Sequence, residues 1–146
     1  LSFPAVPQVT ALDADTLTVA AQAKLAGGPI FELAFDPNRR RLYAFSALAP
    51  DYRGLTVWRA PDLEPVALVA GSSDFPLRTA SALALTSNGD LLVSEASGLW
   101  QIAPDNFAVR NAYPDIPQTS TGGLSVSRQG RVYLVEPSSH LLRIYP

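Results

Sequence analysis

Short runs of aliphatic, β-branched and aromatic residues recur along the chain, and Pro, Gly, Asn or Asp separates each run from the next. The stretch Leu83–Glu95 matches Leu124–Glu136 at a constant offset of 41 residues, and Leu33–Phe45 is a third copy with one extra residue in its middle. Each copy has the pattern of two short strands joined by a turn, with Asn-Gly or Gln-Gly in two of the three turns. The pattern therefore predicts an all-β chain built from repeats.

A second element follows each copy: Val57–Pro61, Trp100–Pro104 and Leu142–Pro146, at offsets of 43 and 42 residues. Asp-x-x-x-Val follows the first two of these, which adds a fourth strand. Four short strands in about 43 residues make one blade of a β-propeller. The innermost strands are expected at Ile30–Phe35, Thr79–Leu85 and Thr121–Val126, and the third strands at Leu55–Ala60, Leu99–Ala103 and Leu141–Tyr145.

The repeat divides the chain into four units. Residues 1–25 supply the third and outer strands of an incomplete blade, 26–71 and 72–113 are complete blades, and 114–146 form a last blade without its outer strand. About three blades are fewer than the four to eight that close a ring, so the chain is expected to be half of a six- or seven-bladed propeller. We expect a partner to cover the open ends. This partner is either the remainder of the propeller, on an upstream segment or a second chain, or a second copy of the chain in a homodimer.

Two segments resemble known propeller repeats. Gly130–Ile144 is similar to the NHL repeat, and Gly27–Tyr43 resembles the YVTN-type repeat of surface-layer and lactonase propellers, both related to the six-bladed regucalcin and gluconolactonase-like propellers. The resemblance implies a fold whose members include scaffolds, ligand sensors and sugar-lactone hydrolases. The metal-ligand positions of the lactonases fall on Phe31, Ser81 and Gly122, which do not form a ligand set for a hard cation. We therefore assign no metal, cofactor or catalytic residue within the segment.

Composition narrows the classes of function. The net charge of −2 argues against nucleic acid as a partner, because phosphate binding needs an excess of Lys and Arg. There is no cysteine, so disulfides and thiolate metal sites are absent, and no apolar run is long enough to predict a membrane span. The only histidine, His140, is expected in a turn with a structural role. Because the chain has no methionine and related repeats are often exported, we expect a processed chain in the periplasm or outside the cell.

Six residues are candidates for ligand contact. Glu32 and Arg78 flank the starts of inner strands, Arg39 belongs to a basic run in the first turn, and Asp51, Tyr52 and Arg53 lie in the longest predicted loop, Ala47–Arg53. Loops on a rigid scaffold often carry function. The alternative interpretation is structural: an arginine or backbone amides satisfy Glu32, and the basic run is a solvated turn. Trp58 and Trp100, at nearly equivalent positions, are expected to pack between blades.

The sequence thus predicts a rigid binding scaffold for a small molecule, glycan or protein partner. The alternative is part of a lactonase-type hydrolase whose catalytic residues lie mainly outside this segment. A purely structural, surface-layer role is a third possibility, and it would call for many further copies of the repeat.

Overall fold

The computed structural model describes residues 8–25, 28, 30–49, 52–70, 82–95, 98–114, 116, 123–136 and 140–146, with the side chains at 31, 47–49, 52, 53 and 136 left out. Every regular element in these residues is a strand, which confirms the predicted all-β class. None of the described residues forms a helix that could cross a membrane. The strands are β1 (Gln8–Leu12), β2 (Val19–Lys24), β3 (Ile30–Asp36), β4 (Arg41–Ala49), β5 (Tyr52–Arg59), β6 (Glu64–Ala70), β7 (Ala82–Leu85), β8 (Leu91–Glu95), β9 (Gly98–Ile102), β10 (Val109–Tyr113), β11 (Gly123–Val126), β12 (Val132–Glu136) and β13 (Leu141–Tyr145).

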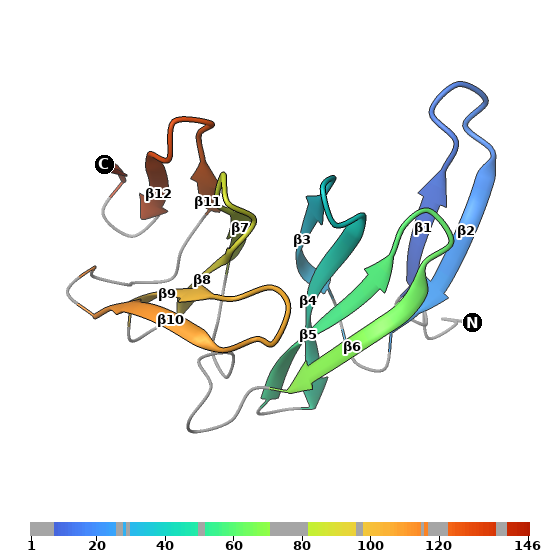
Figure 1. Cartoon of the computed structure of the whole chain (residues 1–146), viewed down its shortest axis with the longest axis horizontal. Helices are drawn as coiled ribbons and strands as arrows, with labels where there is room; N and C mark the ends of the chain where they lie inside the picture. Colours follow the sequence, from blue (N-terminus) through green and yellow to red (C-terminus); the bar gives the residue numbers. More distant parts are fainter. Residues whose placement is uncertain are drawn as a thin grey trace.

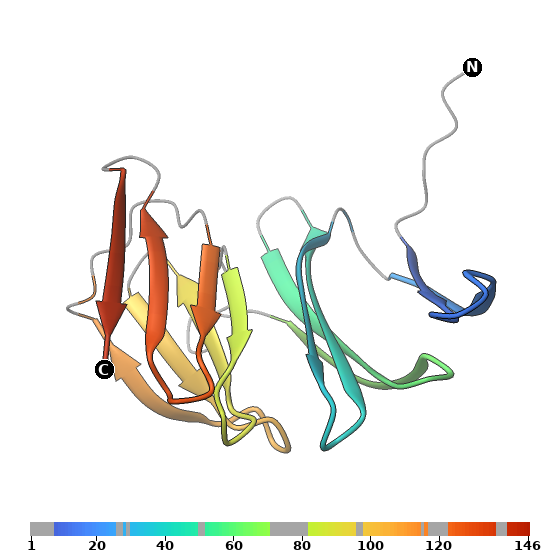
Figure 2. The same ribbon diagram turned by 90° about the horizontal axis from the view of Figure 1, so that it is seen from above.

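The strands form four antiparallel sheets, which we call blades 1 to 4 (Figure 1). Blade 1 is the pair β1-β2, blade 2 is β3-β4-β5-β6, blade 3 is β7-β8-β9-β10, and blade 4 is β11-β12-β13. Within each blade the strands follow one another in space as they do in the sequence, because consecutive strands pair antiparallel with their neighbours. Seen from above, the blades succeed one another along an arc, with β7 contacting both β3 and β11 (Figure 2). These three strands are the inner strands of their blades.

The turns after the inner strands explain the repeat. In blades 3 and 4 the same backbone hydrogen bond closes the turn: Gly89 N–H donates to the Thr86 carbonyl, and Gly130 N–H donates to the Ser127 carbonyl. Both glycines have positive φ (81° and 85°), which residues with a Cβ rarely adopt, so Asn-Gly and Gln-Gly suit this turn. Blade 2 has one extra residue here, and Arg40 takes the positive φ of 52°.

The prediction of a loop at Ala47–Arg53 is wrong for most of that stretch. β4 continues through Ala49 and β5 begins at Tyr52, with Ala47 paired to Arg53 and Ala49 to Tyr52 across a register shift. Antiparallel pairing extends because this stretch is mostly small or apolar and has no breaker before Pro50, so both strands lengthen together. Tyr52 and Arg53 are therefore strand residues.

A second type of turn joins the third and outer strands, and it has the same form in three blades. Beside this turn Leu12 pairs with Val19, Trp58 with Pro65 and Ile102 with Val109, the second residue of each pair being on the outer strand. In each blade the residue two positions before that outer-strand residue has a positive φ. These turn residues, Leu17, Leu63 and Phe107, have φ of 56°, 54° and 57°. A large apolar side chain in this conformation is uncommon. In blades 2 and 3 this side chain, Leu63 or Phe107, packs against an apolar core, whereas Leu17 of blade 1 is exposed.

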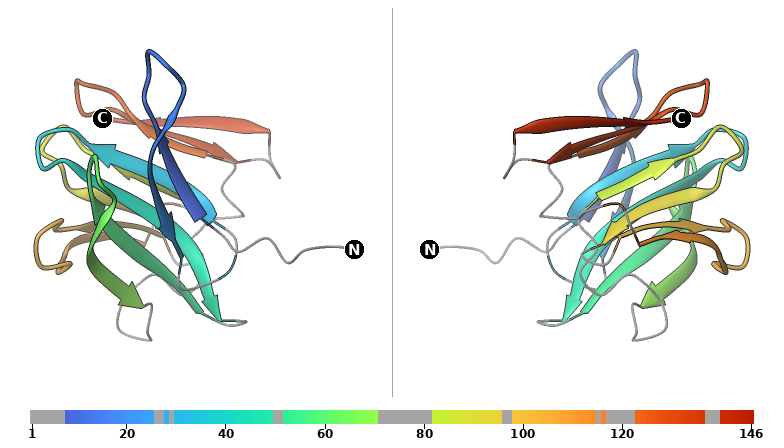
Figure 3. Two further views of the ribbon diagram at one scale, coloured as in Figure 1. Left: turned by 90° about the vertical axis from the view of Figure 1, so that its right-hand side faces the viewer. Right: turned by 90° about the vertical axis from the view of Figure 1, so that its left-hand side faces the viewer.

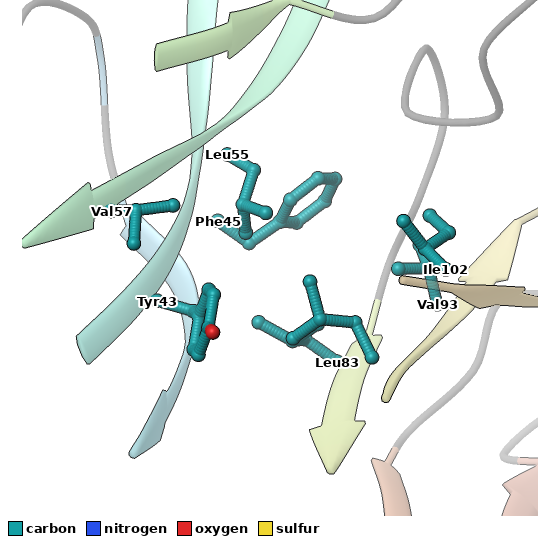
Figure 4. Packing of buried hydrophobic residues seen from close by; sticks show 8 residues of the cluster. Tyr43, Phe45, Leu55, Val57, Leu83, Val93 and Ile102 are labelled. Carbon is teal, nitrogen blue, oxygen red and sulfur yellow. The ribbon is translucent and has the colours of Figure 1, made fainter. Parts of the chain in front are cut away.

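The main core lies between blades 2 and 3 (Figure 4). Tyr43, Phe45, Leu55 and Val57 of blade 2 face Leu83, Leu91, Val93 and Ile102 of blade 3, and Phe107 packs against the same cluster. A smaller core joins blades 1 and 2, and it contains Val9, Trp58 and the turn residue Leu63. In both cores, the turn residue of one blade fills space beside the preceding blade.

Trp58 packs between blades, as predicted, because its cluster includes Val9 of β1. Trp100 pairs with Val93, a residue of the core between blades 2 and 3, so it lies on the side of its sheet that faces blade 2. The two tryptophans are offset in register, however. Trp58 pairs with Pro65, two residues after the turn residue Leu63, and the residue at that place in blade 3 is Ile102, which pairs with Val109, rather than Trp100.

Candidate functional site

Glu32 lies in β3, where its backbone pairs with Phe45 of β4. Directly paired residues share a sheet face, so the carboxyl group is on the side of blade 2 that faces blade 3. The side chain is half-buried, and the described residues supply no hydrogen-bond or ion-pair partner for it. Burial raises the pKa of Glu32 above its ordinary value, because the ionised form has lost part of its hydration. A ligand that donates a hydrogen bond to this carboxylate would stabilise its ionised form.

The strand extensions of β4 and β5 lie at the same end of blade 2 as Glu32. Ile30 pairs with Ser46, Ser46 pairs with Gly54, and the pairing continues through Ala47 and Arg53. Tyr52 and Arg53 are thus only a few ladder positions from Glu32, and the structure brings these three predicted residues to one end of one sheet. Asp51 and Arg78, the candidates beside them in the prediction, lie outside the described residues.

Arg39 lies at the opposite end of blade 2, in the turn between β3 and β4. Its guanidinium pairs with Asp36 at 3.0 Å and with Asp105 of blade 3 at 3.4 Å. Arg41 joins the same group, with Nη1 3.0 Å from Asp105 Oδ1 and 2.9 Å from the carbonyl oxygen of Pro104. The network therefore ties blade 2 to blade 3, and the cationic charge of Arg39 is compensated by two carboxylates.

Asp36, the last residue of β3, holds this network together at the start of the turn. Its carboxylate accepts hydrogen bonds from the backbone amides of Asn38 and Arg39, at 2.9 and 3.1 Å, and from the Arg39 guanidinium. Burial by itself would raise the pKa of Asp36, but these hydrogen bonds and the charge of Arg39 outweigh it, so the pKa lies below its ordinary value. Sequence reasoning missed this residue, although an Asp three positions before an Arg in a turn is a signal for such a pair.

We expect Asp36→Asn to lower the free energy of unfolding by about 1–3 kcal/mol at pH 7, because it removes charge-assisted hydrogen bonds from a side chain that is 2% exposed. A pKa lowered by folding gives stability that is present above the unfolded-state pKa and is lost as the pH falls. The difference from wild type should therefore shrink as the pH drops below about 4, measured by urea unfolding across a pH series. Asp105→Asn, at an exposed position in the same network, should cost less than about 1 kcal/mol. Equal costs for the two variants would contradict the buried role of Asp36.

The described residues contain no group of three or more His, Cys, Asp or Glu side chains that could hold a metal ion. The turn before β13 includes His140, which is exposed and has a positive φ of 57°. Its position, between β12 and β13, is that of a turn residue, as the sequence predicts.

Hollows lie between and beside the blades. One, of about 340 Å³, lies between blades 3 and 4, and sequence analysis did not anticipate it. Its lining includes Leu92, Leu99 and Gln101 of blade 3 and Val132 and Tyr145 of blade 4. Two others are a hollow of about 380 Å³ at the turns of β3–β4 and β7–β8, and one of about 320 Å³ beside β5 and β6. All three are open to solvent.

Comparison with solved structures identifies the fold. The chain is similar to the β-propeller domain of Cps50 (Swd1) from Myceliophteria thermophila, with a TM-score of 0.67 and 14% sequence identity. The match covers 94% of this chain and 44% of that domain, so the chain spans less than half the length of the propeller it matches. A scan of the sequence against models of protein families finds no match, and neither does a search of curated proteins. The fold is therefore that of a β-propeller, seen here as an arc of blades.

Proposed function

We propose that the chain is a rigid binding scaffold, whose ligand docks at the end of blade 2 that carries Glu32, Tyr52 and Arg53. The observation that carries this proposal is the carboxyl group of Glu32, which is half-buried on an inner strand and has no partner among the described residues. A buried charge without a partner costs stability, and such groups are retained where they serve binding. The ligand is a small molecule, glycan or protein segment that presents a cationic group or hydrogen-bond donors to this carboxylate.

The NHL- and YVTN-type resemblance supports the same proposal. The NHL-like segment covers β12 and most of β13 with their connecting turn, and the YVTN-like segment leads into β3 and the start of β4. The connections at the ends of such strands are where a rigid scaffold often carries its function. A location in the periplasm or outside the cell stays a prediction. So does the lactonase-type alternative, whose catalytic residues would lie mainly outside this segment.

We expect Glu32→Gln to raise the free energy of unfolding at pH 7, by less than about 1 kcal/mol because the side chain is only half-buried. A pKa raised by folding means that the ionised group lowers stability progressively as the pH rises through the glutamate range. The gain should therefore vanish at about pH 3, where both proteins are neutral at this position. Glu64→Gln, on the exposed strand β6, is the matched control and should give no gain.

Binding itself is tested with panels of glycans, small cationic molecules and basic peptides, applied to wild type, Glu32→Gln and Glu64→Gln. The proposal expects at least one ligand that binds wild type and Glu64→Gln but is weakened about tenfold or more by Glu32→Gln, as for a lost charged hydrogen bond. Ligands that bind all three proteins equally would show that this end of blade 2 is not the site. Absence of binding to every panel would count against the scaffold proposal.

Partner blades form the second part of the proposal. Leu12 and Leu17 of blade 1 are exposed, Leu17 to 72%, whereas the equivalent residues Ile102 and Phe107 pack in the core between blades 2 and 3. At the other end of the arc, Val135, Leu142 and Ile144 of blade 4 are exposed on adjacent strands. Figure 3 shows these two end blades in turn. We propose that further blades cover both faces, from an upstream segment, a second chain or a second copy.

The expected result for the isolated 146-residue chain is self-association, because apolar faces of this extent are rarely left open by monomers. Sedimentation analysis over a range of concentrations measures it directly. A dimer would favour closure by a second copy, and higher aggregates would favour closure by an upstream segment. A stable monomer at all concentrations would contradict the proposal that other blades cover the end faces.

A further inference from the structure

The hollow of about 320 Å³ beside β5 and β6 also includes Lys24, the last residue of β2, in its lining. On the blade 2 side it is lined by Thr56 and Trp58 of β5 and by Pro65 and Leu68 of β6. Thr56 pairs with Leu68 and Trp58 with Pro65, so these residues share the face of blade 2 on which Trp58 meets blade 1. The hollow therefore belongs to the interface between blades 1 and 2.

The repeat explains why space remains beside Thr56. Trp58 and Ile102 hold the same place in their blades, so the counterpart of Thr56, two residues earlier in the strand, is Trp100. Blade 3 thus carries an indole ring where blade 2 carries a threonine, and the indole nitrogen of Trp100 is buried. What the position of Thr56 lacks is a flat aromatic group.

The facing side of blade 1 is built from small side chains as well. Val9 and Ala11 of β1 are the counterparts of Leu55 and Val57 of β5, and each is smaller than its counterpart. Leu55 and Val57 pack in the main core, whereas Val9 and Ala11 belong to the smaller core between blades 1 and 2. The interface between blades 1 and 2 is therefore filled less completely than the next one along the arc.

Two polar groups of the hollow favour an anion. The Thr56 side chain is 8% exposed, and its Oγ1 is buried with no hydrogen-bond partner among the described residues. A buried hydroxyl in this state costs free energy, which a ligand that accepts its hydrogen would recover. Lys24 is exposed, and no ion pair joins its ammonium group to another described residue. A carboxylate accepts hydrogen bonds from both kinds of donor.

We propose that this hollow binds a small aromatic carboxylate. Its ring takes the place that the Trp100 indole has in blade 3, and Trp58, Pro65 and Leu68 supply the apolar walls. Its carboxylate accepts a hydrogen bond from the Thr56 hydroxyl and pairs with Lys24. The site is separate from the Glu32 end of blade 2, because it lies on the opposite face of the sheet and selects the opposite charge.

Indole-3-acetate is the probe, because it joins an indole ring to a carboxylate. Indole-3-acetamide is the matched control compound, with the same ring and no charge. Isothermal titration calorimetry measures the binding of both to the full chain. We expect indole-3-acetate to bind at least threefold more tightly than the amide, and to lose that advantage when the ionic strength is raised from about 0.02 M to about 0.5 M, because salt screens an exposed ammonium group.

Three variants of the chain test the residues in the proposal. Thr56→Trp fills the hollow with the side chain of its counterpart and should abolish binding. Thr56→Val removes the hydroxyl at nearly constant volume and should weaken indole-3-acetate about tenfold, as for a lost hydrogen bond to a charged group. Lys24→Gln should weaken it about threefold, since the ammonium group is exposed. Thr56→Val and Lys24→Gln should leave the affinity for the amide within about twofold.

Two further variants are controls for these changes. Thr10→Trp adds an indole at an exposed position of β1, beside Val9 but on the other face of the strand. Arg128→Gln removes one positive charge from the exposed turn of blade 4. Both should bind indole-3-acetate like wild type. Circular dichroism checks that every variant is folded, and Thr56→Val together with Lys24→Gln decides the matter if Thr56→Trp does not fold.

Three results would overturn the proposal. One is the absence of binding to wild type at indole-3-acetate concentrations up to about 5 mM. Another is equal affinity for the acid and the amide, which would remove the preference for an anion. The third is binding that Thr56→Val and Lys24→Gln leave unchanged, which would place the ligand elsewhere. Glu32→Gln should bind indole-3-acetate like wild type, so the result is independent of the ligand site proposed at the other face of blade 2.

Discussion

Phe45→Ala is expected to lower the free energy of unfolding by about 3–5 kcal/mol, the largest effect of any single truncation considered for this chain. Phe45 is 0% exposed in the core between blades 2 and 3, where it lies with Leu55 and Leu83. Removing the ring loses its transfer free energy and leaves a cavity that two twisted sheets cannot close by a small shift. Because typical domains are stable by about 5–15 kcal/mol, the variant should unfold at a much lower urea concentration.

Phe35→Ala is the matched control for this prediction. Phe35 lies in β3, next to the strand of Phe45, but it pairs with Leu42 rather than with a residue of the main core, and it is 50% exposed. The same truncation there should cost about 1 kcal/mol, in proportion to the smaller area removed from contact. Urea unfolding followed by tryptophan fluorescence compares both variants with wild type. Similar costs at the two positions would mean that the interface between blades 2 and 3 is not the main source of stability.

Gly98→Ala should cost about 3 kcal/mol or more. Gly98 begins β9 with a φ of 145°, a conformation that residues with a Cβ rarely adopt. An added Cβ would lie 2.6 Å from the carbonyl oxygen of Tyr113 and 2.9 Å from the Cα of Pro114, and both are backbone atoms. Strain and collision add together, because neither β9 nor β10 can move without breaking their ladder.

Gly123→Ala tests whether the effect belongs to the site or to glycine in general. Gly123 begins β11, and an added Cβ there would meet no atom within 4 Å. This variant should unfold within about 0.5 kcal/mol of wild type, in thermal or urea unfolding at the same pH. A large loss at Gly123, or none at Gly98, would contradict the backbone packing at the start of β9.

The repeat in the sequence was sufficient to predict the fold because its turns depend on local chemistry. Gly89 and Gly130 occupy the same positive-φ position, so their spacing predicts the same hairpin in blades 3 and 4. The length of β4 and β5 could not be predicted in this way. Pro50 is the one breaker between Ala47 and Arg53, but it does not show how close to it the pairing runs, because the extent of a ladder depends on the partner strand as much as on the sequence.

The candidate site was harder to predict for a related reason. The sequence places Glu32 near the start of the first inner strand and Arg39 in the turn after it, but it does not show how different their electrostatic surroundings are. The partner of Arg39 in blade 3, Asp105, is 66 positions away and belongs to another repeat. Contacts between blades depend on how sheets twist and stack, which no local pattern encodes.

The packing of Leu63 and Phe107 against the preceding blade has a consequence for biosynthesis. Each of these residues belongs to the last hairpin of its blade and packs against the blade made before it. A chain that emerges from the ribosome in order can therefore seal one interface only when the whole of the next blade has been synthesised. Until then the apolar strands of the nascent segment are exposed to solvent, so the speed of translation through each hairpin and the presence of chaperones help to determine its yield.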